Sequence, residues 1–342
     1  MLTRSRNKIK IADWPNYLLL ELKKLWHDLT KGDLWLFASF IVILLIGLLV
    51  LSSASSVYSF QKFGDSYFLF KKQLVAAVVG FIALVVATKI DYKIWQKYAI
   101  QLLGISFVLL VAVFLPGIGV EYKGANSWIN LGFTNIQPTE IVKFTLVAYF
   151  SAWLASRKEQ LQKFDINVFM GPLFAVALAS FLIFIEPDTG TLGVVLLTLV
   201  GVYFMSNAPI RHVLALITAG ILLIIVGIFL APYRMRRMMA FLNPENDPLG
   251  IGYHILQAKL AIGSGGWFGL GVGKSRQKFN YLPEVFGDSI FAVLAEEIGF
   301  VFSVVFIGLL LFAMWRCYLV IKNAPDDFWR LLSGGISIWF FI

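Results

Sequence analysis

The chain has 342 residues, of which 59% are hydrophobic and 14% are charged, and its mean hydropathy is +0.79. Soluble globular domains are about 45–50% apolar and about 25% charged. The composition of this chain therefore excludes a soluble globular domain and indicates a polytopic membrane protein. The net charge of +9 does not indicate nucleic-acid binding, because basic residues of membrane proteins collect beside anionic lipid headgroups. The single cysteine, Cys317, excludes a disulfide framework.

Residues 1–33 form a basic leader. Within it, Leu18, Leu22, Leu25 and Leu29 fall on one helical face. This pattern fits a helix on the cytoplasmic membrane surface, and a poorly ordered leader fits the composition equally well.

Nine apolar runs follow the leader. A spanning helix needs roughly 20 mostly apolar residues. Such runs occur at 34–54, 73–90, 98–116, 137–155, 168–186, 189–206, 213–231 and 288–315, and the ninth begins near Phe328. We therefore predict an all-α fold, a polytopic bundle of transmembrane helices over residues 34–342. Because the chain stops inside the ninth run, we expect the bundle to be incomplete at its C-terminal end.

The connecting segments alternate in charge. The leader and the segments 89–97, 156–163, 207–212 and 316–330 are basic, and they alternate with 55–72, 117–136, 187–188 and a long polar segment, 233–287. Cytoplasmic loops carry the excess of Lys and Arg, so we predict a cytoplasmic N-terminus and an extracellular loop at 233–287.

The loop 233–287 is basic although it is expected outside. Such a surface favours an anionic partner, either the phosphates of a lipid-linked substrate or ordinary lipid headgroups. We expect two short helical pieces around glycine hinges, and the glycine run before Lys274 is a weak candidate for a phosphate cradle. The basic residues are Arg234, Arg236, Arg237, Lys259, Lys274, Arg276 and Lys278, against the acids Glu245, Asp247 and Glu284.

Ionisable side chains at the spanning helices are costly, and each one is a functional candidate. Glu140 and Lys143 share one helical face and can pair, although Lys143 can instead snorkel to the outer interface. Glu186 and Asp188 stand in a tight outer turn, where we expect solvated carboxylates, with Asp188 favouring the start of the next helix.

Three acids mark the start of the eighth run. Glu296 and Glu297 lie about two turns into it and, being adjacent, point to different faces, so at most one should line a given cavity. Glu297 could pair with a basic side chain of another helix. Asp288 stands at the boundary itself, where an aspartate can cap the helix or act as a general base.

A set of short motifs occurs in order from the third to the eighth apolar run. They are GANSWI (124–129), QPTE (137–140) with Lys143, EPDTGT (186–191), FLNP (241–244), GSGG (263–266), YLPE (281–284) and the stretch from Asp288 to Glu297. Taken together, these segments resemble the SEDS family (shape, elongation, division and sporulation) of bacterial membrane glycosyltransferases. Phe286-Gly287 departs from the His-Thr pair usual in the family, and Asn126-Ser127 replaces a commonly basic pair. The 116–119 turn and the 274–278 run are more similar to the FtsW branch than to RodA.

The resemblance implies ten spans and polymerisation of lipid II into glycan strands on the outer face of the bacterial cytoplasmic membrane. It also implies a class B penicillin-binding protein and divisome proteins as partners, beside the membrane lipids. Asp288 matches the essential aspartate of the family. Substrate-binding roles are expected for Trp128, Glu140, Lys143, Arg234, Arg236, Lys274, Arg276, Glu284 and Glu297.

Lipid II polymerisation requires only a few catalytic groups. A sugar hydroxyl attacks the anomeric carbon of a diphosphate-linked glycan, so one carboxylate can serve as base. The leaving diphosphate needs its charge neutralised, either by basic residues or by a divalent cation such as Mg²⁺ or Mn²⁺. Competing interpretations are a RodA-like elongation polymerase, a lipid II flippase or transporter, and a non-catalytic scaffold. A transporter usually shows two similar halves, and we detect no such repeat.

Overall fold

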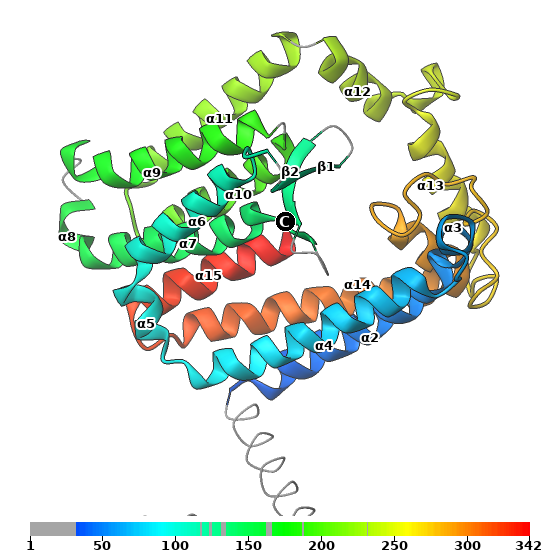
Figure 1. Ribbon diagram of the computed structural model, residues 1–342, viewed down its shortest axis with the longest axis horizontal. Helices are drawn as coiled ribbons and strands as arrows, with labels where there is room; N and C mark the ends of the chain where they lie inside the picture. Colours follow the sequence, from blue (N-terminus) through cyan, green and yellow to red (C-terminus); the bar gives the residue numbers. More distant parts are fainter. Residues whose placement is uncertain are drawn as a thin grey trace, which may run out of the picture. The chain divides into compact units, whose positions relative to one another are not determined.

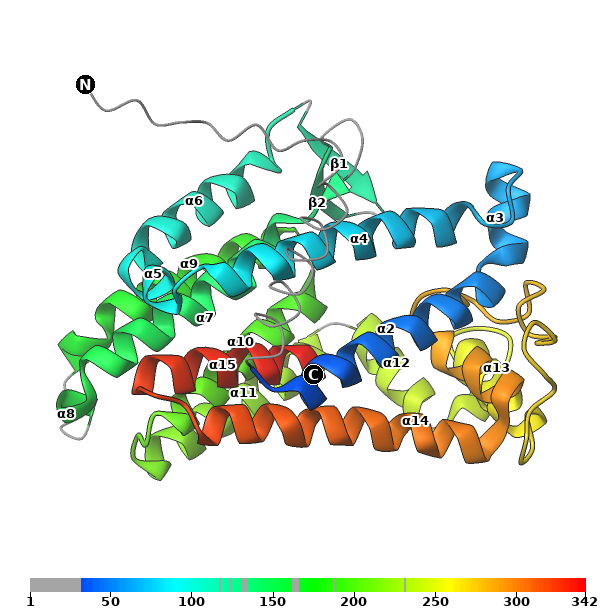
Figure 2. The same cartoon turned by 90° about the horizontal axis from the view of Figure 1, so that it is seen from below.

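A computed structural model describes residues 32–116, 118–122, 125–130, 135–161, 166–186, 188–230 and 232–342, and nearly all of the predicted leader 1–33 lies outside these ranges. The helices and strands are drawn in Figure 1 and Figure 2. The chain divides into two compact units. One comprises the residues up to Ile90 together with Ala240–Arg316, and the other comprises Asp91–Met239 together with Cys317–Ile342. We describe each unit by itself.

The first unit is built on long apolar helices. These are α2 (Leu34–Ala54), α4 (Phe68–Lys89) and, up to Arg316, α14 (Ile290–Lys322), with the short α3 (Ser56–Phe63) between the first two. Helices α2 and α4 pack together. Helices α2 and α14 run antiparallel, because Asp33 at the start of α2 pairs with Arg316 at 2.5 Å while Ser53 near its end bonds Glu297.

The polar part of the first unit contains the end of α12 (Pro232–Leu242), the 3₁₀ turn η2 (Pro244–Asn246) and α13 (Tyr253–Ser264). Helix α13 confirms the helical spacing that the sequence shows at 251–262. From Gly265 to Ser289 the chain runs without a further helix to the start of α14.

The second unit is a helical bundle. Helix α7 (Pro138–Ser156) packs against α6 (Ala99–Ala112), α9 (Ile166–Ile185), α10 (Thr189–Met205) and α15 (Asp327–Phe341). Glycine permits close approach of these helices: a Cβ at Gly335 of α15 would lie 2.4 Å from Val147 of α7 and 2.8 Å from Val202 of α10. The remaining helices are α5 (Tyr92–Lys97), α8 (Lys158–Leu161), α11 (Ile210–Leu230) and most of α12.

The connection before α7 holds a small antiparallel sheet that we did not predict. Strands β1 (Gly119–Tyr122), β2 (Ala125–Asn130) and β3 (Asn135–Ile136) lie in the order β1-β2-β3. Trp128 pairs with Val120, and the register shifts just after Val120. The sheet places Trp128 next to the start of α7.

Each of the nine predicted apolar runs coincides with a helix, with ends that shift by a few residues. By length and composition, α2, α4 and α14 are the helices of the described part that could each cross a membrane, and shorter apolar helices occur in α6, α9, α10 and α11. The all-α, multi-pass fold class is confirmed.

Candidate active site

Asp288 lies two residues before the first residue of α14, and its side chain is exposed. A tight turn presents it: the amides of Gly287 and Ser289 both donate to the carbonyl of Glu284, at 3.0 and 3.2 Å. Glu284 itself adopts a left-handed conformation with φ of 49°. Within the described ranges the Asp288 carboxylate forms no hydrogen bond or ion pair, so it does not cap α14.

The residues around Asp288 hold this turn in place. Ser289 is buried, donates to the carbonyl of Pro283 at 3.1 Å and contacts His254 Nε2 on α13. The Phe286 ring packs on Tyr58 of α3 with centroids 4.6 Å apart. Phe286, which departs from the family pattern, therefore anchors the turn by an aromatic contact.

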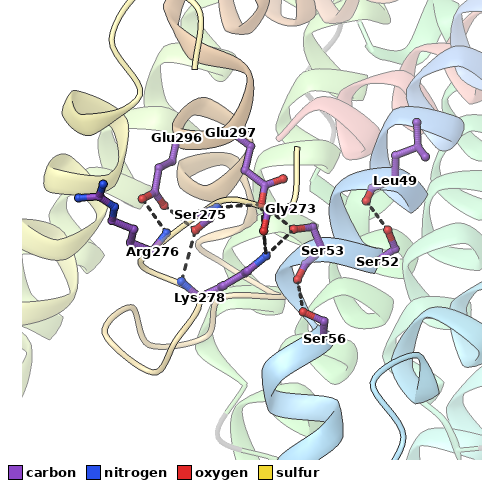
Figure 3. Close-up of polar contacts among 10 residues, drawn as sticks. All are labelled: Leu49, Ser52, Ser53, Ser56, Gly273, Ser275, Arg276, Lys278, Glu296 and Glu297. Atoms are coloured by element: carbon purple, nitrogen blue, oxygen red, sulfur yellow. Dashed lines mark hydrogen bonds and ion pairs between the residues drawn. The ribbon is translucent and has the colours of Figure 1, made fainter. Parts of the chain in front are cut away.

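The basic segment 273–278 is fastened to α14 by two adjacent glutamates (Figure 3). Glu296 is 1% exposed and accepts from Ser275 Oγ at 2.5 Å and from the Arg276 amide at 3.0 Å. Glu297 is 2% exposed and accepts from Ser53 Oγ at 2.5 Å and the Ser275 amide at 3.3 Å.

Lys278 completes this network. Its ammonium lies 3.7 Å from Glu297, donates to the Gly273 carbonyl at 2.5 Å and to Ser53 Oγ at 3.1 Å, and is buried. We expected the two glutamates to serve different faces, but both hold one segment, because that segment lies across both side chains. The basic partner of Glu297 comes from the loop and not from another helix.

The glycine run before Lys274 forms main-chain hydrogen bonds with α14 at the point where the helical conformation of α14 is interrupted. Gly299 has φ of 78° and ψ of −178°, which is not helical. The carbonyls of Glu296 and Glu297 accept from the amides of Leu270 and Gly271 at 3.0 Å each, and the amides of Phe300 and Val301 donate to the carbonyls of Gly266 and Trp267. The amides of Leu270 and Gly271 are thus already bonded, so the phosphate-cradle interpretation is wrong for them.

Lys274 and Arg276 stay outside this network. Both side chains are exposed, and neither forms an ion pair or hydrogen bond with the parts of the chain that the structure covers. In Figure 3 the Arg276 side chain points away from the glutamates while its backbone amide points toward them. The segment is therefore fixed through its backbone amides, Ser275 and Lys278, while the side chains of Lys274 and Arg276, unpaired among the described residues, are available to an anion.

In the second unit, Lys143 pairs with Glu140 at 2.7 Å, as their spacing predicts. The Lys143 ammonium also lies 5.0 Å from the ring centroid of Trp339. Its side chain is only 11% exposed, against 49% for Glu140. Lys143 therefore ends in an ion pair and a cation–π contact and does not snorkel into solvent.

Glu186 is the buried acid that sequence reasoning missed. It lies in the turn between α9 and α10, yet it is 1% exposed and neither carboxylate oxygen has a hydrogen-bond partner among the described residues. Burial, with a smaller contribution from the charge of Asp188, raises the pKa of Glu186 to about 7, although the Ser127 hydroxyl acts in the opposite direction. The expectation of a solvated carboxylate is wrong here, because Ser127 of β2 covers the turn and bonds the Glu186 carbonyl at 3.5 Å.

The neighbouring acid behaves as predicted. Asp188 accepts from the amide and hydroxyl of Thr191 at 3.0 and 2.7 Å, which caps α10. It also accepts from Gln137, which precedes α7, at 3.1 Å. Trp128 is half-buried. Arg236 of α12 is exposed, and the side chain of Arg234 lies outside the described part.

The predicted site residues thus fall into two groups. Asp288, Glu284, Lys274, Arg276 and Glu297 belong to the first unit, where the 273–278 segment and the Asp288 turn are both tied to the first turns of α14. Trp128, Glu140, Lys143, Arg234 and Arg236 belong to the second unit. Their roles toward a substrate stay predictions.

These features define a multi-pass membrane protein whose polar segment presents a carboxylate and two cations, all exposed and without a partner among the described residues, at the start of one long helix. The sequence profile of the FtsW/RodA/SpoVE family, described as "Cell cycle protein", matches residues 33–342. The chain belongs to this family.

Individual relatives agree with this assignment. Stage V sporulation protein E of Bacillus subtilis is 38% identical over 307 residues, covering 90% of this chain and 84% of its own length. The probable peptidoglycan glycosyltransferase FtsW of Trichlorobacter lovleyi is 33% identical over 324 residues, covering 95% of this chain and 85% of its own.

Solved structures show the same fold. A chain from a study of polymerization and crosslinking by a peptidoglycan synthase complex aligns with a TM-score of 0.73 at 25% identity, over 91% of this chain and 84% of that one. The rod shape-determining protein RodA of Thermus thermophilus aligns with a TM-score of 0.63 at 25% identity, over 91% and 82%.

Proposed function

We propose that the protein is a peptidoglycan glycosyltransferase that polymerises lipid II on the outer face of the cytoplasmic membrane, with Asp288 as the general base. The observation that carries this proposal is the exposed Asp288 carboxylate, which has no partner within the described ranges, on a turn held by the Ser289–Pro283 hydrogen bond and the Phe286–Tyr58 ring contact. A base must be free to accept a proton and fixed in place, and Asp288 meets both conditions.

The reaction requires a general base for the attacking hydroxyl and positive charge for the leaving diphosphate. A sugar hydroxyl of one substrate loses its proton to Asp288 as its oxygen bonds to the anomeric carbon of the other. The bond from that carbon to the diphosphate oxygen breaks, and the diphosphate leaves with the electron pair. Lys274 and Arg276 are exposed and unpaired among the described residues, so they can stabilise the negative charge on the leaving group.

A divalent cation is the other means of neutralising that charge. Among the described residues no group of three His, Cys, Asp or Glu side chains is suited to hold a metal. Mg²⁺ usually needs only one or two carboxylates when substrate phosphates supply the other oxygens. A cation that takes part would therefore enter with the diphosphate and be held mainly by its oxygens.

Family membership supports a role in cell division. It also supports a cytoplasmic N-terminus, and a class B penicillin-binding protein and divisome proteins as partners. The FtsW relatives support the division role, and the similarity to a chain of a peptidoglycan synthase complex supports a partner. A RodA-like elongation role and lipid II transport are the alternatives.

Replacing Asp288 by Asn tests the proposal. Asparagine preserves the size of the side chain but cannot accept the proton, so glycan polymerisation by the purified protein with its partner should fall by at least about 100-fold. The protein should insert and accumulate normally, because Asp288 supports no contact among the described residues. Polymerisation at the wild-type rate would place the base elsewhere, and lipid II transport without polymer from the wild type would favour the flippase.

A further inference from the structure

The second unit contains a cavity of about 660 Å³ at one end of its helices, away from the candidate active-site residues of that unit along α7. It is formed where α5 and α6 meet the C-terminal end of α7 and the first part of α9. This is the end that the basic connections 89–97 and 156–163 predict to face the cytoplasm. The lining residues that the argument uses are Gln96, Lys97, Ile100, Tyr149, Trp153 and Arg157.

Two of the lining residues are cations without an acidic partner. Lys97 ends α5 and Arg157 follows α7, both are exposed, and neither forms an ion pair within the described ranges. The adjacent Lys158 shows the contrast, because it pairs with Asp327 at 2.9 Å. The cavity therefore concentrates positive charge that the described protein does not neutralise, which favours an anionic ligand.

The guanidinium group of Arg157 is held in position by its neighbours. The Arg157 guanidinium carbon lies 5.3 Å from the ring centroid of Trp153, which is 7% exposed, and Nη1 donates to Ser156 Oγ at 3.4 Å. Stacking on a buried ring orders the guanidinium while leaving most of its donors unused. A planar group of this kind suits the oxygens of a phosphate.

The wall of the cavity combines polar and apolar groups. Tyr149 is half-buried, and its hydroxyl has no hydrogen-bond partner in the described part of the chain. It faces Gly171 of α9, where an added Cβ would lie 3.4 Å from the hydroxyl oxygen. Ala99, Ile100, Ala152 and Trp153 supply apolar surface beside the polar groups.

We propose that this cavity binds the headgroup of an anionic phospholipid, with Lys97 and Arg157 at the phosphodiester and Tyr149 as a further donor. Charge alone would also fit a soluble phosphate. The apolar lining and the position at the ends of membrane helices favour a lipid, because an acyl chain can follow Ile100 out of the cavity, where this side chain is 67% exposed. Basic pockets between membrane helices on the cytoplasmic side are a known way to hold such headgroups.

Native mass spectrometry of the full-length chain in detergent tests the proposal. Phosphatidylglycerol should bind at one saturable site, and the Lys97→Gln/Arg157→Gln double variant should bind it roughly 30-fold more weakly. Tyr149→Phe should weaken binding several-fold without adding or removing charge.

The matched control is Lys93→Gln/Arg211→Gln, which removes the same charge from exposed positions of this unit outside the cavity lining. It should leave the saturable site intact, and an equal loss in this control would show diffuse attraction and overturn the proposal. Equal binding of phosphatidylcholine, or displacement of the lipid by an equal concentration of inorganic phosphate, would also overturn it. All variants should show the wild-type thermal transition, since the substituted groups support no buried ion pair.

Discussion

The buried ion pair of Lys278 and Glu297 joins three separate stretches of the sequence. Glu297 lies on α14, Lys278 on the basic segment, and Ser53 near the end of α2 bonds both of them. A buried pair contributes little net stability over an apolar replacement, but each charge depends on the other. Its role is therefore to fix the position of the segment that carries Lys274 and Arg276.

Replacing Lys278 by Met should destabilise the protein strongly. The change leaves Glu297 buried without its counter-ion, which typically costs about 3–5 kcal/mol of unfolding free energy. The double variant Lys278→Met/Glu297→Gln should be more stable than the single variant. Thermal unfolding in detergent measures both, and a single variant as stable as wild type would show that the two charges are not coupled.

Glu186 gives the protein a pH dependence of known sign. Burial raises its pKa from 4.5 to about 7, so the folded state holds this proton more tightly than the unfolded chain. Its stabilising contribution is complete below pH 4.5 and is lost as the pH rises through about 7.

Glu186→Gln should remove that contribution to the pH profile. Between pH 5 and pH 8, the thermal midpoint of the wild type should fall relative to that of the variant, and the variant should be the more stable protein at pH 8. Parallel midpoints across this range would mean that Glu186 gains no proton on folding.

At the scale of elements, the glycine at position 299 determines the shape of α14. Its φ of 78° is strained for any other residue, and a Cβ there would lie 2.2 Å from the Gly269 amide nitrogen. The break frees the backbone groups that bind residues 266–271. The loop and the helix are therefore a single structural element joined by main-chain hydrogen bonds.

Gly299→Ala tests this join. The substitution forces either a strained backbone, at about 1–3 kcal/mol, or separation of the loop from the helix. Gly308→Ala is the control in the same helix, because a Cβ there meets no atom within 4 Å and alanine favours helix. We expect the first variant to lose thermal stability and polymerase activity and the second to retain both; equal behaviour would make the break incidental.

Sequence patterns predicted the helices well and the contacts poorly, for physical reasons. Apolar length alone sets a spanning helix, so runs such as 34–54 match α2 to the residue. The partner of Glu297 could not be found, because Lys278 and Ser53 reach it through tertiary folding. The strands at 119–136 are short and carry polar residues, and Glu186 stands in a sequence typical of an exposed turn. The role of Asp288 was predicted from its position at the end of the basic loop and from the family resemblance, and it stays a prediction; the structure shows that its side chain is exposed.

For the whole molecule, the predicted orientation follows from the alternation of basic connections and awaits a direct test. Lys274→Cys should react with a membrane-impermeant maleimide in intact cells, because position 274 is exposed on a loop expected outside. Lys322→Cys, at the C-terminal end of α14, should react only after the membrane is permeabilised. The native Cys317 is buried and gives little background. The reverse pattern would invert the topology.

The backbone bonds between residues 266–271 and the region around Gly299 also determine when, during synthesis, the loop can reach its final structure. The glycine run precedes α14 in the chain, so a ribosome completes it before residues 296–301 exist. During synthesis the bonds from this stretch to residues 296–301 cannot form until about thirty more residues have followed it, at roughly 5–20 residues per second. Chains truncated shortly before residue 296 and released from the ribosome should therefore expose the 266–278 stretch to protease, whereas chains that include the whole of α14 should protect it.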